Sequence, residues 1–407
     1  MNNVAERSDW SFYSGSQLTF GPGAIRALQS VVARRKLKRV LVVTDTVLSE
    51  VGIVDQAENV LAKTSADWML FTEGEPEPST SLVTRLAELA RCYQPDLFVA
   101  IGGGSNMDLA KAAAAAFGHN IDPEQLLGFD QVPGPTPTLV CLPTTAGTGS
   151  EVTHSAVLRS SATEQKAAIL SQYIRPDVAI VDPKLTLSCP PKVIAECGFD
   201  ALTHAIEALL VDRWSNLTED QEHGLPYEGN HPLGDLYSEK AISLIATNLR
   251  RALEASESIK ARCGMALAAT LAGMAFSSCG VSLAHALEYP IGAKYGCSHG
   301  IGNAIVLPEV MRFWMPERET QLARIAELLG VSKADAMPPR EAAEAGIRML
   351  EKLRTAVFLP SKLSEVGATS TDIQGLAEKT LAAQRLLDLS PRKATASDIN
   401  AILKAAL

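Results

Sequence analysis

The chain has 407 residues, of which 46% are hydrophobic and 20% charged, a balance typical of a soluble globular protein large enough for two cores. Its net charge of −9 provides no basic surface for nucleic acid, so we expect no nucleic-acid partner. No apolar run approaches the roughly 20 residues of a membrane span, and the N-terminus lacks the apolar core of a secretory signal. Seven cysteines, an odd number without a C-x-x-C pair, favour reduced thiols in a cytoplasmic protein.

Strand and helix patterns alternate in the first half of the chain. Helices are expected after the Gly-Pro-Gly break at 21–23 and over 80–92 and 107–117. Apolar, β-branched runs predict buried strands at 18–20, 39–44, 67–71, 96–101, 138–142 and 178–181. Strands that alternate with helices form a parallel sheet with helices on both faces, so the fold class predicted here is α/β.

The pattern changes after about residue 187, where the strand signals stop. Long Ala- and Leu-rich stretches predict helices over 192–210, 235–254, 259–279, 321–329, 340–353 and 371–386. The SCPP sequence at 188–191 interrupts the pattern and marks a boundary. We therefore predict an α/β domain over 1–187 and an all-helical domain over 188–407, with a polar loop at 214–231 that interrupts the helices.

A run of three glycines lies where the strand at 96–101 meets the next helix. Gly102, Gly103 and Gly104 open the sequence GGGSNMD, which also contains Ser105 and Asp108. Glycines at the start of a helix let backbone N–H groups approach a phosphate, which the helix dipole also favours. The pattern is not G-x-G-x-x-G, and a tight turn without a ligand is the alternative.

A second loop of this kind follows the strand at 138–142 and reads PTTAGTGSEVT. Its hydroxyl groups come from Thr144, Thr145 and Thr148. Two loops at the carboxyl ends of strands in one α/β sheet converge on a crevice, which predicts a nucleotide site. Asp45 ends another strand, where a carboxylate can accept hydrogen bonds from ribose hydroxyls and repel a 2′-phosphate. It can equally cap the following helix, and both roles are compatible.

Four side chains in the second half can ligate a divalent metal. Asp200 and His204 are four residues apart in a helical pattern, so they share one face, and His285 and His299 are fourteen apart across a glycine-containing connection. This set of oxygen and nitrogen ligands suits Fe²⁺, Zn²⁺, Mn²⁺ or Co²⁺, whereas the neighbouring Cys297 is a loop filler or a soft ligand. A metal with an open position is a Lewis acid, and beside a nicotinamide it supports hydride transfer.

These motifs together resemble the iron-containing (group III) alcohol dehydrogenases. The matching segments occur in the family's order at Gly102–Lys111, Pro143–Thr153, Gly198–Ala208 and His285–Pro308. The resemblance implies an N-terminal dinucleotide-binding α/β domain and an all-α, dehydroquinate synthase-like metal domain, with the active site between them. It also implies a homodimer or larger assembly, and we expect the strand near Leu18 to join the subunits.

The resemblance assigns roles to individual residues. It implies Asp200, His204, His285 and His299 as the metal ligands, with Fe²⁺ as the metal and Zn²⁺ as the alternative. It places Gly102–Ser105 and Thr144–Thr145 around the cofactor phosphates and nicotinamide, Asp45 at the ribose, and Lys166 at the cofactor. Because Asp45 stands at the ribose, NAD(H) is expected rather than NADP.

The sequence departs from the family pattern at Tyr289, where many members carry a second histidine four residues after the third ligand. Tyrosine is a poorer proton shuttle at neutral pH, although it can position substrate, and a packed aromatic ring is the alternative. Tyr289 and the loop at 214–231 resemble the hydroxyacid–oxoacid transhydrogenase branch, which moves hydride from a four-carbon hydroxy acid to an oxo acid on a retained cofactor. The sequence does not identify a cation for such a carboxylate.

We predict a metal-dependent oxidoreductase that transfers hydride between NAD(H) and a primary alcohol or aldehyde, or a small hydroxy acid. The transhydrogenase is one alternative. A metallohydrolase that uses the same Asp/His site to activate water is an alternative from another class. A lyase of the dehydroquinate synthase type would need more Lys and Arg near the metal motifs, and a non-catalytic nucleotide-binding module would not turn over.

Overall fold

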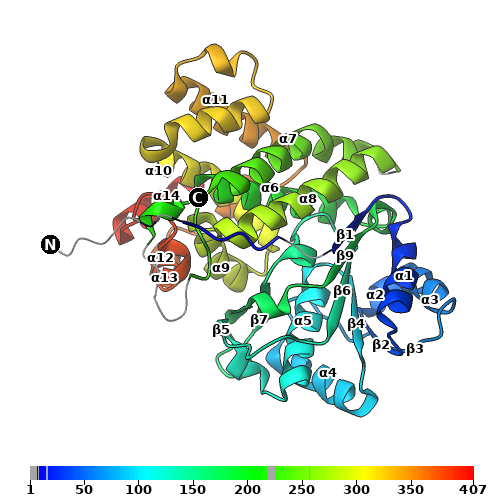
Figure 1. Cartoon of the computed structure of the whole chain (residues 1–407). Helices are drawn as coiled ribbons and strands as arrows, with labels where there is room; N and C mark the ends of the chain where they lie inside the picture. The colour runs from blue at the N-terminus through cyan, green and yellow to red at the C-terminus, as the bar shows by residue number, and fades with distance from the viewer. Residues whose placement is uncertain (1–6, 8, 15–16, 218–224, 256) are drawn as a thin grey trace. The chain divides into compact units, whose positions relative to one another are not determined.

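The computed structural model of the chain describes residues 7, 9–14, 17–217, 225–255 and 257–407. Two compact units are present (Figure 1): Tyr13–Cys189, and Pro190–Leu407 with the described residues of Met1–Phe12. Part of the loop expected at 214–231 falls on residues 218–224, outside the described residues.

A six-stranded parallel sheet forms the centre of the first unit, in the order β1-β9-β6-β4-β2-β3. Every strand predicted from the sequence is present, and the α/β fold class is confirmed. The strands are β1 (Gln17–Phe20), β2 (Arg39–Val43), β3 (Asp67–Phe71), β4 (Leu97–Gly102), β6 (Thr138–Pro143) and β9 (Val178–Val181).

Helices cover both faces of this sheet because its strands are apolar on both sides. Alternate residues of a strand point to opposite faces, so Leu41 and Val43 of β2 join the core beneath α4 and α5, whereas Val40 and Val42 join the core beneath α1 and α3. The helices are α1 (Ala27–Arg35), α2 (Thr46–Glu50), α3 (Ile53–Leu61), α4 (Thr80–Tyr93) and α5 (Gly104–His119).

A second, three-stranded sheet was not predicted. Its strands are β5 (Gly128–Phe129), β7 (Ser155–Arg159) and β8 (Lys166–Leu170), with β7 and β8 antiparallel and β5 parallel to β8. Short 3₁₀ turns join the elements of this unit at Ala24–Arg26, Pro123–Leu126, Ser150–Val152, Gln172–Ile174 and Pro183–Thr186.

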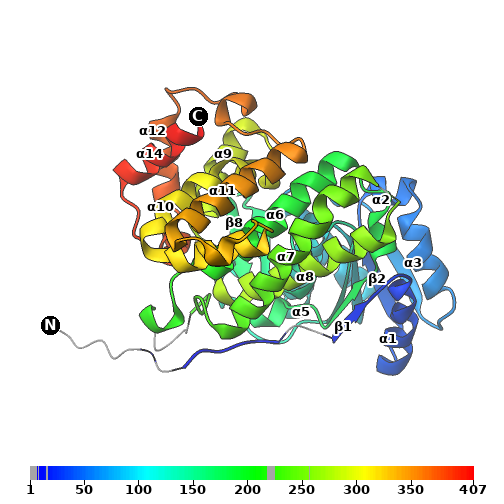
Figure 2. The same cartoon turned by 90° about the horizontal axis from the view of Figure 1, so that it is seen from above.

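The described part of the second unit contains helices and no strand, as predicted. Helices α6, α7 and α8 pack against one another, and α10 packs against α6 and α11 (Figure 2). The helices are α6 (Pro191–Leu210), α7 (Pro232–Glu254), α8 (Ile259–Cys279), α9 (Leu283–Tyr295), α10 (His299–Leu328), α11 (Pro339–Ala356), α12 (Ile373–Leu381), α13 (Gln384–Leu387) and α14 (Ala396–Ala406), with 3₁₀ turns at Trp214–Asn216, Ala334–Ala336 and Leu363–Val366.

Helix α10 is much longer than the helix predicted at 321–329. It begins at His299 and continues past Pro308, and a kink at Arg318 follows Pro316. Proline removes one backbone hydrogen bond and bends a helix without always ending it. The helix expected over 371–386 is in fact two, α12 and α13.

Helix α8 is long and apolar enough to cross a membrane by length and composition, although the sequence analysis expected no such segment. In the structure 61% of its apolar window is buried, and the helix packs against α6 and α7. The core helix of a globular protein has the same properties.

Aromatic contacts attach the start of the chain to the helical unit. The Trp10 ring stacks on His231, with centroids 4.3 Å apart and planes at 5°, and Phe12 stacks on Tyr237 at 5.6 Å. His231 in turn caps α7, because its Nδ1 accepts a hydrogen bond from the N–H of Gly234. The first residues, which the sequence assigned to the sheet domain, therefore contact the helical unit.

Candidate metal and cofactor sites

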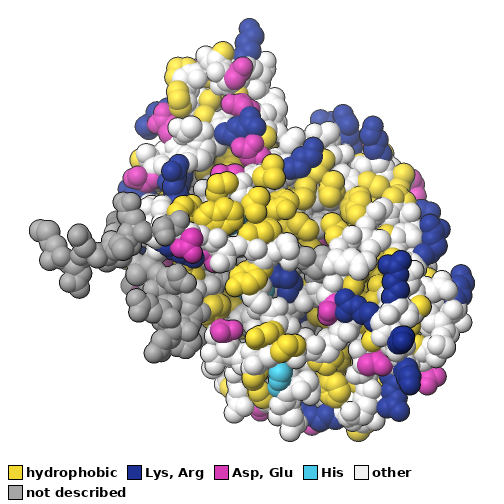
Figure 3. Space-filling model, in the orientation of Figure 1, with side chains coloured by type: hydrophobic (Ala, Val, Ile, Leu, Met, Phe, Trp, Pro, Cys, Tyr) yellow, Lys and Arg dark blue, Asp and Glu magenta, His cyan; other side chains and the backbone are white. Residues whose placement is uncertain are grey.

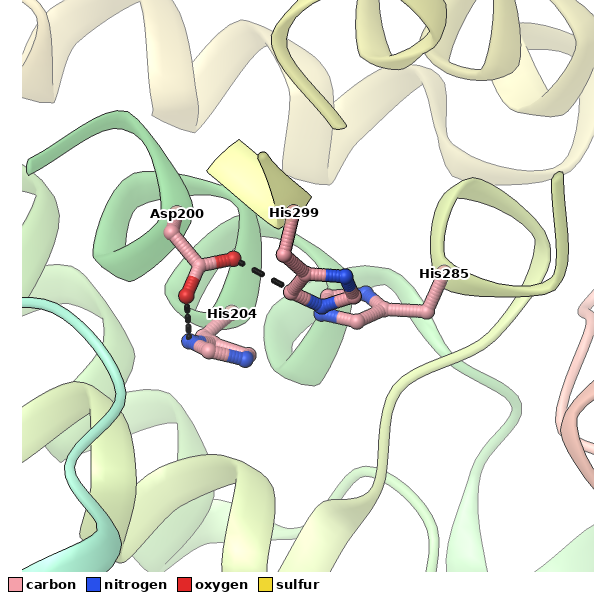
Figure 4. A group of neighbouring side chains, drawn as sticks. All are labelled: Asp200, His204, His285 and His299. Atoms are coloured by element: carbon pink, nitrogen blue, oxygen red, sulfur yellow. Dashed lines mark ion pairs between the residues drawn. The ribbon is translucent and has the colours of Figure 1, made fainter. Parts of the chain in front are cut away.

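Three helices bring the four predicted metal ligands together in one group (Figure 4). Asp200 and His204 lie on one face of α6, His285 lies in α9, and His299 is the first residue of α10. One ligand atom from each residue lies within 4.8 Å of the others. The first three side chains are buried, whereas the His299 side chain is 32% exposed.

The carboxylate of Asp200 lies between two of the imidazoles. Its Oδ2 is 3.9 Å from Nδ1 of His204, and its Oδ1 is 3.8 Å from Nε2 of His299. The His204 and His285 rings stack with centroids 4.8 Å apart. Burial raises the pKa of Asp200, but the three imidazoles and the Asn303 amide outweigh it and hold that pKa below its usual range. The site is therefore arranged around a negative charge.

Each helix that carries a ligand also supplies a side chain that supports a ligand on the next helix. Glu207 of α6 accepts from His285 Nδ1 of α9 at 2.5 Å, and Glu288 of α9 accepts from His299 Nδ1 of α10. Asn303 of α10 completes the circle, because its amide donates to Asp200 Oδ1 of α6 at 3.0 Å. We call Glu207, Glu288 and Asn303 the support set.

The support set fixes the orientation of the imidazole rings. When a carboxylate accepts from Nδ1, the proton is held there and Nε2 keeps a lone pair for a metal. The sequence analysis missed all three residues. Their spacing was a usable signal, since each follows a ligand histidine by three or four positions and so shares its helix face.

Close backbone packing places His299 beside α6. A Cβ at Gly300 would lie 2.1 Å from the carbonyl oxygen of Glu196, so only glycine allows α10 to begin at this distance. The side chain of Ser298 caps the helix by accepting from the N–H of Ile301. On the other side, the Phe276 ring stacks on His204 at 4.2 Å between centroids.

The donor set fits a divalent transition metal. One carboxylate and three imidazoles suit Fe²⁺ or Zn²⁺, with no thiolate in the group. Cys297, considered above as a soft ligand, is not a member of the group found among the described residues.

Tyr289 lies beside this group, with its ring centroid 6.1 Å from that of His299. Burial raises the pKa of Tyr289, and the charge of Arg385 lowers it only partly. The phenol therefore stays protonated at neutral pH and can donate a hydrogen bond, but it is a poor general base.

The two glycine- and threonine-rich loops meet at the carboxyl ends of β4 and β6, as predicted. The N–H of Thr144 donates to the carbonyl of Gly102 at 2.9 Å. A Cβ at Gly104 would lie 2.7 Å from Cγ2 of Thr148, and one at Gly103 would lie 3.4 Å from Oγ1 of Thr145. The glycines thus allow the two loops to pack closely, and α5 begins beside them at Gly104.

Asp45 is the N-cap of α2, accepting from the N–H of Leu48 at 2.9 Å. Its second oxygen accepts from the Asn106 amide at 2.7 Å, and the same amide donates to the carbonyl of Ile101. Asn106, which the sequence analysis did not select, therefore joins Asp45 to the glycine turn.

The carboxylate of Asp108 accepts hydrogen bonds from other residues of the first unit. It accepts from Ser150 Oγ at 2.6 Å and from the N–H of Val157 at 2.9 Å. Lys111, one turn later and fully buried, donates to Ser150 Oγ, Thr153 Oγ1 and the carbonyl of Ser155. This pair holds the 143–153 loop against α5.

Lys166 lies at the start of β8, where Nζ pairs with Oε1 of Glu77 at 2.7 Å. The N–H of Glu77 also donates to Oγ of Ser105 at 3.3 Å, next to the glycine turn. Lys166 and Ser105 therefore both contact Glu77.

The family comparisons agree with this architecture. Residues 15–183 match the family model "Iron-containing alcohol dehydrogenase", and residues 225–407 match "Fe-containing alcohol dehydrogenase family, C-terminal". The chain belongs to the iron-containing alcohol dehydrogenase family. It is therefore an oxidoreductase, and the predicted fold and family resemblance are confirmed.

Individual relatives of this family align along nearly the whole chain. The chain is 33% identical to the NAD-dependent methanol dehydrogenase of Bacillus methanolicus, over 98% of this chain and 100% of the relative. It is 30% identical to the mitochondrial hydroxyacid–oxoacid transhydrogenase of Xenopus laevis, over 99% and 92% of the two chains. The crystal structure of a 1,3-propanediol oxidoreductase superposes with a TM-score of 0.91 at 32% identity, covering 98% of this chain and 100% of that one.

Proposed function

We propose that this chain is an NAD(H)- and iron-dependent dehydrogenase of primary alcohols or their aldehydes. The observation that carries the proposal is the group of Asp200, His204, His285 and His299, whose ligand atoms lie within 4.8 Å of one another. We propose Fe²⁺ as the resident metal and Zn²⁺ as the alternative. The family assignment favours this reaction over the metallohydrolase.

In this proposal the metal supplies Lewis-acid chemistry that polarises the oxygen of the alcohol or aldehyde. Asp200 contributes the negative charge of the site, and Glu207 and Glu288 hold the His285 and His299 rings with Nε2 free. Tyr289, beside His299, positions the substrate by donating a hydrogen bond rather than by taking its proton.

The proposed cofactor site lies in the first unit, and we propose the helical domain predicted at 188–407 as the metal domain. We assign Gly102, Gly103, Gly104 and Ser105 to the cofactor phosphates, together with Thr144, Thr145 and Thr148. Asp45 is assigned to the adenosine ribose, with Lys166 as a further contact. Asp108 acts indirectly by holding the 143–153 loop.

A transhydrogenase is the second candidate function. Two observations favour it: the 30% identity to a hydroxyacid–oxoacid transhydrogenase, and Tyr289 where the family pattern has histidine. In that reaction the cofactor stays bound while hydride passes from a hydroxy acid to an oxo acid.

We propose a cytoplasmic homodimer or larger homo-oligomer that binds neither nucleic acid nor membrane. Strand β1 lies at the edge of the six-stranded sheet, and an edge strand can pair with a second copy. The net charge is −9, and on the face in Figure 3 basic and acidic side chains are interspersed, which disfavours nucleic acid.

The test is a panel of primary alcohols and small hydroxy acids, assayed for NAD reduction with added Fe²⁺ or Zn²⁺, for the wild type and His285→Ala. We expect metal-dependent NADH formation that the variant loses. Undiminished NAD reduction by His285→Ala would refute the metal site. Hydride exchange between a hydroxy acid and an oxo acid without free NAD would favour the transhydrogenase.

A further inference from the structure

One guanidinium nitrogen in the helical unit is buried without a hydrogen-bond partner among the described residues. Nη1 of Arg385, in α13, is buried and has no hydrogen-bond partner in the part of the chain that the structure describes. The group lies over the Tyr227 ring, with Cζ 5.7 Å from the ring centroid. A desolvated guanidinium N–H without an acceptor is costly, so this arrangement favours an anion from outside the chain.

Two other partly buried arginines of the same unit donate to acceptors, although Nε of Arg354 is also buried without a hydrogen-bond partner among the described residues. Nη1 of Arg354 donates to the carbonyl of Ala304 at 2.9 Å. Arg318 donates to the carbonyl of Leu210 and to the carboxylate of Asp212. Arg385 differs from both, because an aromatic face is the neighbour that its guanidinium has. A purely structural arginine would be expected to resemble Arg354 or Arg318.

The residue that follows Arg385 is connected to the ligand group by a short chain of hydrogen bonds. Glu207 holds His285 at 2.5 Å and also accepts from the N–H of Ser282 at 3.0 Å. The hydroxyl of Ser282 donates to the carbonyl of Leu386, the residue after Arg385, at 2.8 Å. Helix α13 is thereby fixed to the N-terminus of α9, which carries His285.

One tyrosine contacts Arg385, and another lies beside the metal ligands. Tyr227, under the guanidinium, packs on the end of α8 at Gly280, four residues after the Phe276 that stacks on His204. The second tyrosine, Tyr289, lies beside His299, with ring centroids 6.1 Å apart. Arg385 and Tyr227 therefore lie where α8 ends and α9 begins, next to the helices that carry Phe276 and His285.

We propose that Arg385 binds the carboxylate of a substrate whose hydroxyl or carbonyl oxygen faces Asp200, His204, His285 and His299. A guanidinium presents two parallel N–H groups that match a carboxylate, and the tyrosine faces supply an apolar wall for the intervening carbons. The substrate class is then a short-chain hydroxy acid or the corresponding oxo acid. This inference rests on the proposed function and selects among its substrates.

The test compares one substrate pair, 4-hydroxybutanoate and 1-butanol, on the metal-loaded enzyme. The variant Arg385→Gln keeps hydrogen-bonding capacity and removes the charge. We expect its KM for 4-hydroxybutanoate to rise roughly 10- to 100-fold, the range for a lost hydrogen bond to a charged group, while KM for 1-butanol stays unchanged. Arg385→Lys should restore part of the loss, since it keeps the charge but not the fork.

Arg392→Gln is the matched control, because Arg392 also lies over an aromatic ring, Phe313, but donates to a backbone carbonyl. It should leave the ratio of the two KM values unchanged. Equal changes for both substrates in Arg385→Gln, or turnover of 1-butanol with none of 4-hydroxybutanoate by the wild type, would overturn the proposal.

A binding measurement separates this inference from the proposed function. Calorimetry of butanoate with metal-free protein should show binding to the wild type that Arg385→Gln lacks. Failure of every alcohol and hydroxy acid to reduce NAD would count against the dehydrogenase alone. Equal butanoate binding by wild type and variant would overturn the role of Arg385 whatever the activity.

Discussion

Replacing Glu207 or Glu288 with glutamine separates the contribution of each carboxylate to metal binding from its contribution to the stability of the fold. Glu288→Gln changes a side chain that has one hydrogen-bond partner, Nδ1 of His299, since its Oε1 has none among the described residues. Glutamine can accept that bond with its carbonyl oxygen and turn its amide toward the free side. The buried amide N–H groups then lack an acceptor, but the buried negative charge is also removed. Because these two effects oppose each other, we expect stability to change by less than about 1 kcal/mol.

Metal affinity should respond differently, because the carboxylate raises the basicity of the His299 ring. Loss of such a support typically lowers metal affinity about 10- to 100-fold. Glu207→Gln should have the same effect on affinity and also destabilise the fold. Glu207 accepts from His285 and Ser282 on one oxygen and from the Ala284 N–H on the other, at 2.7 Å. An amide cannot accept on both sides, so one buried donor is lost at about 1–3 kcal/mol.

The assay combines chelator competition for Fe²⁺ or Zn²⁺ with urea unfolding of the metal-free proteins. The expected pattern is weaker metal binding in both variants and lower stability in Glu207→Gln alone. Unchanged metal affinity in Glu288→Gln would refute the argument that this carboxylate supports His299. Equal destabilisation of the two variants would refute the argument that Glu207 stabilises the fold through more hydrogen bonds than Glu288.

Three further predictions follow from other contacts. Lys111→Met leaves the buried Asp108 without its cation, so urea unfolding should show a loss of about 3–5 kcal/mol in stability. The KM for NAD should also rise, and an unchanged KM would mean that the 143–153 loop does not contact the cofactor. Gly300→Ala should cost about 1–3 kcal/mol and weaken metal binding, because its Cβ meets the Glu196 carbonyl, whereas normal metal content would contradict the packing argument. Burial lowers the pKa of His231 from 6.5 to about 4, so the neutral ring contributes its full stability above pH 6.5. About 3 kcal/mol of this stability should be lost as the pH falls towards 4. A His231→Asn variant whose stability has the same pH dependence would rule out this origin.

The sheet of the first unit was predictable because its strands are apolar on both faces and stand out from the helices. The smaller sheet was not, since β8 reads KAAIL, and alanine has no strand preference that would reveal it. Its stability comes from pairing with β7 and from Asp108, whose carboxylate accepts from Val157 of β7. Such tertiary contacts leave no local pattern.

The four ligand residues were predictable from spacing and from the family motifs, but their supports were not selected. Glu207 and Glu288 share a helix face with His204 and His285, which the sequence shows. The structure pairs each carboxylate with a histidine of another helix, and no sequence spacing indicates this exchange. Arg385 was missed for a similar reason, because it lies 86 residues after the last metal ligand, His299, in the sequence.

The most direct test of the central claim is the metal content of the purified chain measured together with its NAD reduction. The wild type, stripped with a chelator, should lose alcohol-dependent NADH formation and regain it as one equivalent of Fe²⁺ is restored. Asp200→Asn should bind less metal and recover little activity, although the metal-free protein remains folded. Full activity of the stripped wild type, or one equivalent of tightly bound metal and normal activity in Asp200→Asn, would contradict the account.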